Sequence, residues 1–157
     1  MTISKFQKLF GVGPAGALIG VLIFCILGLL DRALHHIQIF SRPAPIRAAG
    51  LILVLIWICW HAWCLRTISQ WWRHDRLCTT GPYRFVRHPI YSGATLLAVA
   101  GISLMCNSWI ILLWPLFLFS VYSLLVRKEE AMMASIFGEE YRRYAAQTAR
   151  LFPRLFR

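Results

Sequence analysis

The chain has 157 residues, of which 59% are hydrophobic, and its formal net charge is +11 at pH 7. This length leaves no room for a separate soluble catalytic module beside the apolar segments. The positive charge is divided among segments that flank apolar runs, which favours a membrane surface over a nucleic acid as its partner. The sequence therefore predicts an all-α integral membrane protein, with residues 1–157 forming a single membrane domain.

The first two apolar runs each fit one membrane helix. Residues 9–30 lie between Lys8 and Asp31, and residues 48–65 form the second run. A helix needs about 20 apolar residues to cross a bilayer. The first run is longer than the roughly 7 to 15 apolar residues of a cleavable signal, and no small-x-small cleavage site ends it, so we expect it to be retained.

The third apolar run is too long for one helix. Residues 89–126, which number 38, carry no formal charge. As one helix they would reach about 57 Å, whereas the hydrocarbon core is roughly 30 Å thick. The run must fold back, and Asn107 lies at the natural turn. We predict a helical hairpin with legs 90–106 and 109–126, which brings the number of transmembrane helices to four.

The distribution of basic residues predicts the orientation. Fourteen Lys and Arg residues lie before the first span, in 66–88 or after residue 126, whereas three lie in the loop between the first two spans. Positive residues collect on the cytoplasmic side, so both termini should be cytoplasmic. The small size and the lack of targeting signals favour a bacterial inner membrane. After the hairpin, residues 127–150 predict an amphipathic cytoplasmic tail helix.

The remaining metal and redox signals are weak. The five cysteines form no Cys-x-x-Cys pair, so neither a metal site nor a disulfide is indicated. His61 is the one ionisable residue inside a predicted span, which makes it either a functional candidate or part of an interfacial belt with its tryptophan neighbours. No obligate protein partner is predicted.

The chemically richest segment precedes the hairpin. In Arg87-His88-Pro89 the residue before proline avoids helical angles, while proline suits the first helical position, so a helix should start at Pro89 with His88 as its cap. Such a helix start beside Arg84, Arg87 and His88 favours a carboxylate or a phosphate. Tyr83 and Tyr91 would add aromatic faces.

The far end of the hairpin should bring acidic groups to the same place. Because its two legs are nearly equal in length, Glu129 and Glu130 should return to the depth of His88, and only one of them should turn into the cleft, since adjacent helix positions point about 100° apart. Together these groups suit a ligand with a carboxylate, an ammonium and a soft cationic centre. S-adenosylmethionine carries all three. The alternative is that the Arg and Tyr residues are interfacial anchors.

Two ordered motifs give a family resemblance. Residues 81–93 read Gly-x-Tyr-x-x-x-Arg-His-Pro-x-Tyr-x-Gly, and Glu129-Glu130 is followed by Gly138-Glu139-Glu140-Tyr141. The pair resembles the isoprenylcysteine carboxyl methyltransferase family. The resemblance implies an integral membrane methyltransferase that binds S-adenosylmethionine in a cytosol-facing pocket and admits a lipophilic substrate from the side. The cofactor-binding region would cover about residues 75–145.

The resemblance also implies roles for single residues. Arg87 and Glu130 are the expected catalytic residues, and Glu130 or His88 is the nearest base for a protonated amine. The methyl acceptor stays open between a carboxylate, an amine and a thiol, and Leu125 stands where eukaryotic members have an arginine. The cofactor site would be lined by Tyr83, His88, Pro89, Ile90, Tyr91 and Glu129.

Two functions of other classes stay open. Membrane sterol reductases share a similar C-terminal architecture, so an NADPH-dependent membrane reductase is one alternative. A membrane subunit without catalytic activity is the other, and it predicts affinity for neither cofactor.

Overall fold

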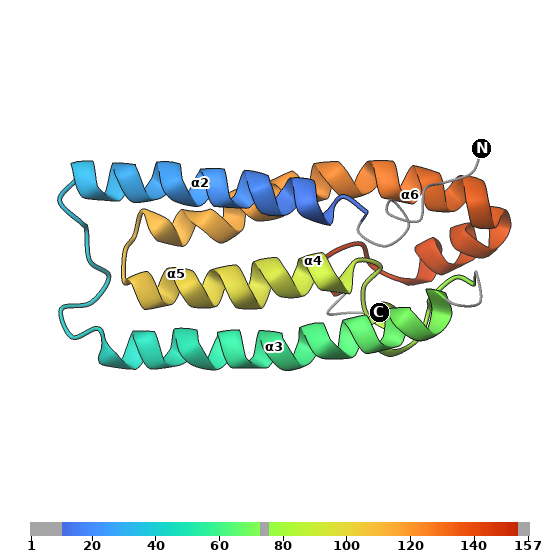
Figure 1. The fold of residues 1–157 in the computed structure, drawn as a ribbon, viewed down its shortest axis with the longest axis horizontal. Coiled ribbons are helices and arrows are strands. Elements are labelled where there is room, and N and C mark those ends of the chain that lie inside the picture. The colour runs from blue at the N-terminus through green and yellow to red at the C-terminus, as the bar shows by residue number, and fades with distance from the viewer. Residues whose placement is uncertain (1–10, 73–75, 154–157) are drawn as a thin grey trace.

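The structure is a computed structural model that describes residues 11–72 and 76–153, and the described part forms a bundle of helices (Figure 1). Four of its helical segments are long and apolar enough to cross a membrane, as predicted. Residues 9 and 10 of the first predicted span lie outside the described residues. The elements in chain order are α2 (Gly13–Ala33), α3 (Ala44–Trp72), η1 (Gly81–Arg84), α4 (Pro89–Gly93), η2 (Ala94–Val99), α5 (Ala100–Cys106), η3 (Ile111–Leu113) and α6 (Trp114–Gln147).

The predicted hairpin is confirmed. Its first leg is the continuous helical segment Pro89–Cys106, in which η2 is a short stretch of π-helix between α4 and α5. Asn107 ends this leg with left-handed backbone angles, φ 52° and ψ 40°. Asparagine tolerates that conformation better than most residues, which explains the sharp reversal.

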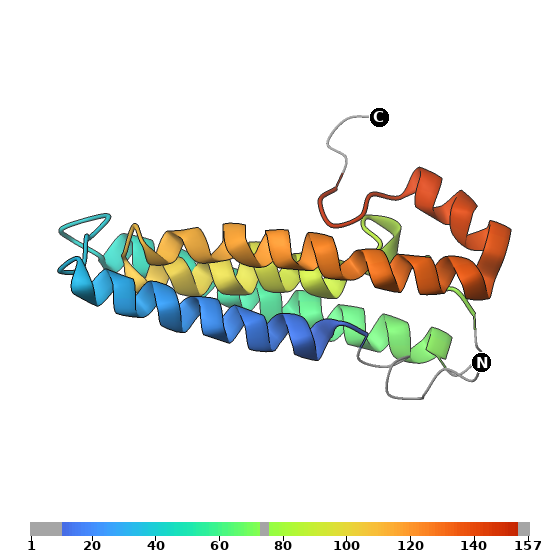
Figure 2. The ribbon, with the colours of Figure 1, turned by 90° about the horizontal axis from the view of Figure 1, so that it is seen from above.

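Two helix ends differ from prediction. α3 extends well beyond the predicted span of residues 48–65 at both ends, because a charged residue ends a membrane span without ending a helix. The predicted tail helix of residues 127–150 is continuous with the last span, without a break at residue 126. α6 continues past residue 126 until Gly138, whose φ of 53° and ψ of −123° interrupt the helix. Beyond Gly138 the helix changes direction (Figure 2).

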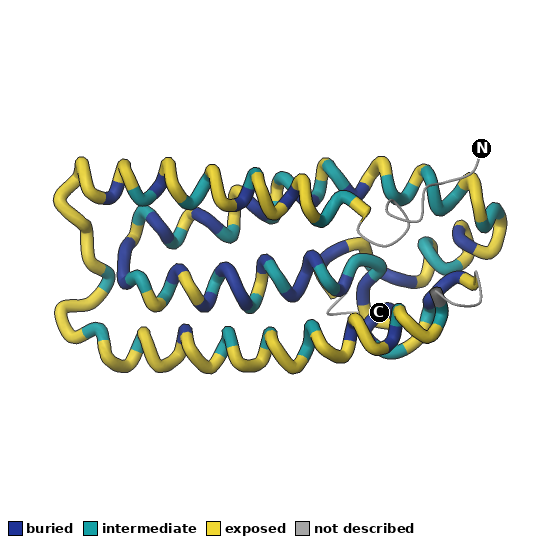
Figure 3. Tube along the Cα trace, in the orientation of Figure 1, coloured by how far each residue is buried: buried dark blue, intermediate teal, exposed yellow. Residues whose placement is uncertain are grey.

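The hairpin's first leg lies in the middle of the bundle, with α3 along one side and α2 and α6 along the other (Figure 1). Half of the residues of Pro89–Cys106 are buried, against 11% in the most apolar stretch of α3 and 17% in that of α2. Figure 3 shows the same contrast along the traces. The exposed side chains of α2 and α3 are largely apolar, which suits contact with lipid.

Polar side chains tie the hairpin turn to the preceding loop. Ser108 Oγ donates to Asp31 Oδ1 at 2.5 Å, and Asp31 Oδ2 lies 2.7 Å from His36 Nδ1. The Asn107 side chain accepts from Phe40 N–H at 3.1 Å and donates to Phe40 O at 2.9 Å. We call Asp31, His36, Asn107 and Ser108 the turn latch. It joins the end of α2 to the start of the hairpin's second leg.

Glycine sets the spacing between α3 and α5. A Cβ atom on Gly50 would overlap the carbonyl oxygen of Gly101, whereas Gly28 on α2 has open space around it. Small residues allow membrane helices this close approach.

We expect Gly50→Ala to lower the free energy of unfolding by about 1 to 3 kcal/mol, because the added methyl forces two backbones apart. Gly28→Ala is the matched control and should leave stability unchanged or slightly higher. Thermal unfolding in one detergent measures both. Equal stability of the two variants would contradict the packing described here.

Candidate active site

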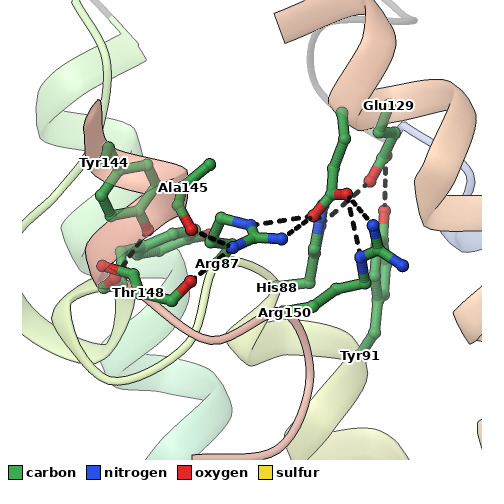
Figure 4. A network of polar contacts seen from close by, with 10 residues as sticks. Arg87, His88, Tyr91, Glu129, Tyr144, Ala145, Thr148 and Arg150 are labelled. Carbon is green, nitrogen blue, oxygen red and sulfur yellow. Dashed lines mark hydrogen bonds and ion pairs between the residues drawn. The ribbon is translucent and has the colours of Figure 1, made fainter. Parts of the chain in front are cut away.

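The two legs of the hairpin meet at His88, directly before α4 (Figure 4). His88 Nδ1 lies 3.3 Å from Glu129 Oε2, and His88 Nε2 lies 3.4 Å from Glu130 Oε1. Both glutamates belong to α6, so the predicted return to the depth of His88 is confirmed. The expectation that only one glutamate would turn inward is wrong, because the imidazole is bracketed by both carboxylates.

Glu130 is held by two guanidinium groups. Arg87 Nε donates to Glu130 Oε1 at 2.8 Å, and Arg150 Nε donates to Glu130 Oε2 at 2.9 Å. A second nitrogen of each arginine lies within 2.7 Å of the same carboxylate. The Arg87 and Glu130 side chains are only 11% and 12% exposed, so this ion pair is shielded from water.

Glu129 has a different set of partners. Its Oε1 accepts a hydrogen bond from the Tyr91 hydroxyl at 2.9 Å and another from the Val12 N–H at 2.8 Å. In the described part of the chain no arginine or lysine forms an ion pair with Glu129. Among the described residues, His88 is the one basic side chain that faces this carboxylate, and it balances the charge when it is protonated. The two adjacent carboxylates thus differ in their electrostatic surroundings.

The chain after α6 completes this site from the other side. Residues 148–151 run beside residues 86–88: Arg87 N–H donates to Ala149 O at 2.8 Å and His88 N–H donates to Arg150 O at 3.2 Å. The Ser92 hydroxyl donates to Leu151 O, and the Arg87 side chain donates to Ala145 O and Thr148 O. The reversal at Gly138 makes this return possible. The backbone at His88 is consequently fixed by the C-terminal segment.

His88 is the titratable group that links the two carboxylates. Burial alone would lower the pKa of His88, but the hydrogen-bonding and charge interactions with Glu129 and Glu130 outweigh it and raise the pKa above its ordinary value. Its Nε2 is buried and makes no hydrogen bond among the described residues, although it lies near Glu130. Such an orphaned polar atom calls for a functional explanation.

Aromatic rings stack beside the carboxylates. The Tyr91 ring lies nearly parallel to the rings of His88 and Tyr122, with centroids 5.8 Å and 4.7 Å away. Tyr83 follows Gly81, whose φ of 57° favours glycine, and its side chain is buried. Burial raises the pKa of Tyr83 well above its usual range, and it raises the pKa of the Cys78 thiol to about 11. Both groups are therefore neutral at physiological pH.

The predicted site residues are only partly in mutual contact. Arg87, His88, Tyr91, Glu129 and Glu130 form one polar cluster (Figure 4).

The other predicted residues have different partners. Pro89 O accepts a hydrogen bond from Trp60 Nε1 at 2.8 Å, and Ile90 packs against the apolar core. The Tyr83 backbone oxygen accepts one from the Tyr144 hydroxyl at 2.6 Å. Arg84 lies over the ring of Phe85 instead of joining the cluster. Whether these residues contact a cofactor stays a prediction.

Sequence reasoning missed three contributors. Arg150 is one of the basic residues that predict the orientation in the membrane, yet its side chain binds Glu130. Val12 contributes a backbone N–H, which no residue type signals, and Tyr122 stacks on Tyr91 from inside an apolar run. Tyr122 could have been found, because it lies seven residues before Glu129 and so shares its helix face.

The sequence profile of the phospholipid methyltransferase family matches residues 46–140, which is more than half of the chain. No solved structure matches the chain significantly.

Three relatives illustrate the similarity. The cobalt-zinc-cadmium resistance protein CzcN of Cupriavidus metallidurans is 35% identical over 94 residues, covering 59% of this chain and 42% of the relative. A probable protein-S-isoprenylcysteine O-methyltransferase of Oryza sativa subsp. indica is 37% identical over 70 residues, covering 45% of this chain and 37% of the relative. The protein-S-isoprenylcysteine O-methyltransferase of Schizosaccharomyces pombe is 38% identical over 68 residues, or 43% of this chain and 29% of the relative. The chain therefore matches less than half the length of these relatives.

The raised pKa of His88 predicts a pH-dependent stability. The folded protein holds the His88 proton more tightly than an unfolded histidine of pKa about 6.5, so this stabilisation is complete below that pH and is lost as pH rises through the folded pKa. We expect the melting temperature to fall as the pH rises above about 6.5, and His88→Gln to flatten the fall. His35→Gln, in an exposed loop, should retain the wild-type slope. The same slope in all three proteins would contradict this assignment.

Arg87 should be a structural requirement of the site. Arg87→Gln breaks a shielded ion pair and two contacts with the C-terminal segment, so we expect a loss of about 3 kcal/mol in unfolding free energy. Arg84→Gln removes a cation–π contact at an exposed site and should cost about 0.5 to 1 kcal/mol. Denaturant unfolding in micelles compares the two variants, and similar losses would refute the distinction.

Proposed function

Because the chain belongs to the phospholipid methyltransferase family, we propose that it is a membrane enzyme that transfers a methyl group from S-adenosylmethionine to a lipophilic acceptor at the cytoplasmic face. The observation that carries this proposal is the arrangement of the two glutamates. Glu130 is neutralised by Arg87 and Arg150, while Glu129 is buried with neutral hydrogen-bond donors and His88.

The chemistry of these groups fits the methyl donor. A buried carboxylate without an arginine partner attracts a cation, and Glu129 can bind the ammonium of an amino acid moiety. The Tyr91 ring, stacked between His88 and Tyr122, offers aromatic surface for a soft cationic centre. We propose that Tyr83, His88, Pro89, Ile90, Tyr91 and Glu129 hold S-adenosylmethionine.

S-adenosylmethionine supplies, when bound, an electrophilic methyl group on a positively charged sulfur. The protein's contribution is then to orient the acceptor and to exclude water. Tyr91 orients the Glu129 carboxylate through its hydroxyl, and the apolar helices around the site keep water away, which strengthens each charge interaction there.

We assign Arg87 and Glu130 a positioning role. Both oxygens of Glu130 are engaged by guanidinium groups, which stabilise its ionised form and leave it a poor base. Arg87 anchors the C-terminal segment that fixes the backbone of His88. His88, which lies between the two carboxylates, would take the proton of a protonated amine acceptor in those molecules whose imidazole is neutral.

The acceptor class follows from the membrane setting. The family is named for phospholipids, and two relatives are named for isoprenylcysteine, so both names point to acceptors with an apolar anchor. We propose a lipid or a small lipophilic molecule that enters from the bilayer and presents a carboxylate, an amine or a thiol. The protein would be an inner-membrane enzyme with both termini cytoplasmic.

Calorimetric titration of S-adenosylmethionine into the detergent-purified protein tests the proposal. We expect binding in the micromolar range, and Glu129→Gln should weaken it about 10- to 100-fold, since a hydrogen bond to a charged group contributes about 1.5 to 3 kcal/mol. Glu139→Gln is the matched control, because Glu139 is exposed and pairs with Arg142 on the far part of α6.

NADPH and S-adenosylhomocysteine are titrated alongside. Binding of NADPH, without binding of the methyl donor or its product, would point to the reductase alternative. If the folded protein binds none of the three compounds, the remaining hypothesis is a membrane subunit without catalytic activity. Once donor binding is established, labelled methyl donor and lipid extracts identify the acceptor.

A further inference from the structure

α2 is attached to the bundle in different ways at its two ends. Its C-terminal end is held by the turn latch, where Asp31 bonds Ser108 and His36. Nearer the middle of α2, Trp114 Nε1 donates to Gly20 O at 2.9 Å, and the Trp114 ring contacts that of Phe24. These directional contacts fix α2, from Gly20 to its C-terminal end, to α6 and to the hairpin turn.

The first two turns of α2, before Gly20, contact the rest of the bundle through glycines. Gly13 faces the Tyr91 ring, and Gly16 faces the Tyr122 ring so closely that a Cβ atom there would overlap it. At both positions an aromatic ring lies against bare backbone. Val12, directly before α2, packs against the apolar core, and its N–H donates to Glu129 Oε1 at 2.8 Å.

This hydrogen bond places α2 in competition with the proposed ligand. Oε1 of Glu129 already accepts from Val12 and Tyr91, and Oε2 lies 3.3 Å from His88. Gly11, at the start of the described chain, also lies against the Glu129 carboxylate and the Tyr91 hydroxyl. An ammonium that binds Oε1 of Glu129 competes with the neutral backbone N–H of Val12 for this oxygen. The exchange is favourable because the carboxylate gains a charged partner.

The first two turns of α2 can move at little cost in a membrane. Only 17% of the most apolar stretch of α2 is buried, so most of the helix surface already faces lipid. Separating apolar helix surfaces in a bilayer exposes them to lipid tails and not to water, so the hydrophobic effect does not oppose opening. The directional contacts at Gly20 and at the turn latch hold the rest of α2 in place.

We propose that α2 is a gate over the Glu129 site: the Val12 N–H caps the carboxylate in the closed state, and α2 swings away from Tyr91 and Tyr122 when the methyl donor binds. This inference rests on the proposed function, because it takes the donor to be the ligand of Glu129. The opened seam between α2 and α6 leads from lipid directly to the site. The same movement therefore admits the lipophilic acceptor.

Gly16→Leu tests the gate, because a side chain at this position wedges α2 away from Tyr122. If the closed state is populated about 90% of the time, a variant that stays open binds donor about tenfold more tightly, since apparent affinity scales with the competent fraction. Gly28→Leu is the matched control on the same helix, where nothing lies within 4 Å. Calorimetric titration of S-adenosylmethionine measures both variants.

A second pair of variants covers the case in which Gly16→Leu does not fold. Val12→Pro removes the backbone N–H that caps Glu129, while Val12→Ala keeps it. We expect Val12→Pro to bind donor more tightly than wild type and Val12→Ala to bind like wild type. Hydrogen exchange by mass spectrometry on the start of α2 gives a readout independent of activity, and donor should accelerate exchange there but not around the turn latch.

The outcomes separate the gate from the proposed function. Wild-type binding that Gly16→Leu and Val12→Pro leave unchanged, with no acceleration of exchange at the start of α2, overturns the gate and leaves the methyltransferase proposal in place. Binding by either variant in the absence of detectable wild-type binding supports the gate most strongly. Binding by no folded variant overturns both.

Discussion

The structure depends on the burial of two adjacent carboxylates at one end of a membrane bundle. A buried carboxylate is costly unless charges or hydrogen bonds compensate it, and Glu129 and Glu130 are only 13% and 12% exposed. Their partners come from four other parts of the chain: the segment before α4, α4 itself, the segment after α6 and the residue before α2. The need to satisfy these two side chains thus draws both ends of the described chain to one place.

The two carboxylates have different partners, so we assign Glu130 a structural role and Glu129 a ligand-binding role. Glu130 is bound by two arginines and serves as a fixed anchor for the C-terminal segment. Glu129 is bound on Oε1 by two neutral groups, which a charged one can replace, and on Oε2 it faces His88. The π-helical stretch η2 directly follows α4. Thr95, which lies in η2, donates a hydrogen bond to the Tyr91 carbonyl at 2.9 Å. Such wide turns frequently occur at functional sites, and this one lies one turn beyond Tyr91.

Much of the fold was predictable because a bilayer imposes few choices. The uncharged run of residues 89–126 is too long for one crossing, so the hairpin and the return of Glu129 and Glu130 to the depth of His88 follow from length alone. Length did not predict that both carboxylates contact His88. The ends of α3 and α6 were not predictable by this reasoning, because hydropathy marks where a span ends and not where a helix ends.

The missed parts of the site are those formed by backbone. The pairing of residues 148–151 with residues 86–88 depends on the reversal at Gly138, and a glycine in a helical pattern does not reveal which way the chain turns. The Val12 N–H carries no side-chain signature at all. Arg150 could be recognised as a site residue only after that reversal was known.

The place of residues 148–151 in the chain also bears on how the protein is made. These residues are synthesised after all four membrane helices, yet they fix the backbone at His88, which belongs to the start of the third membrane helix. Until they have left the ribosome, Arg87 lacks its partners at Ala145 and Thr148, and Glu130 lacks Arg150. The site can therefore close only after the fourth membrane helix has been synthesised.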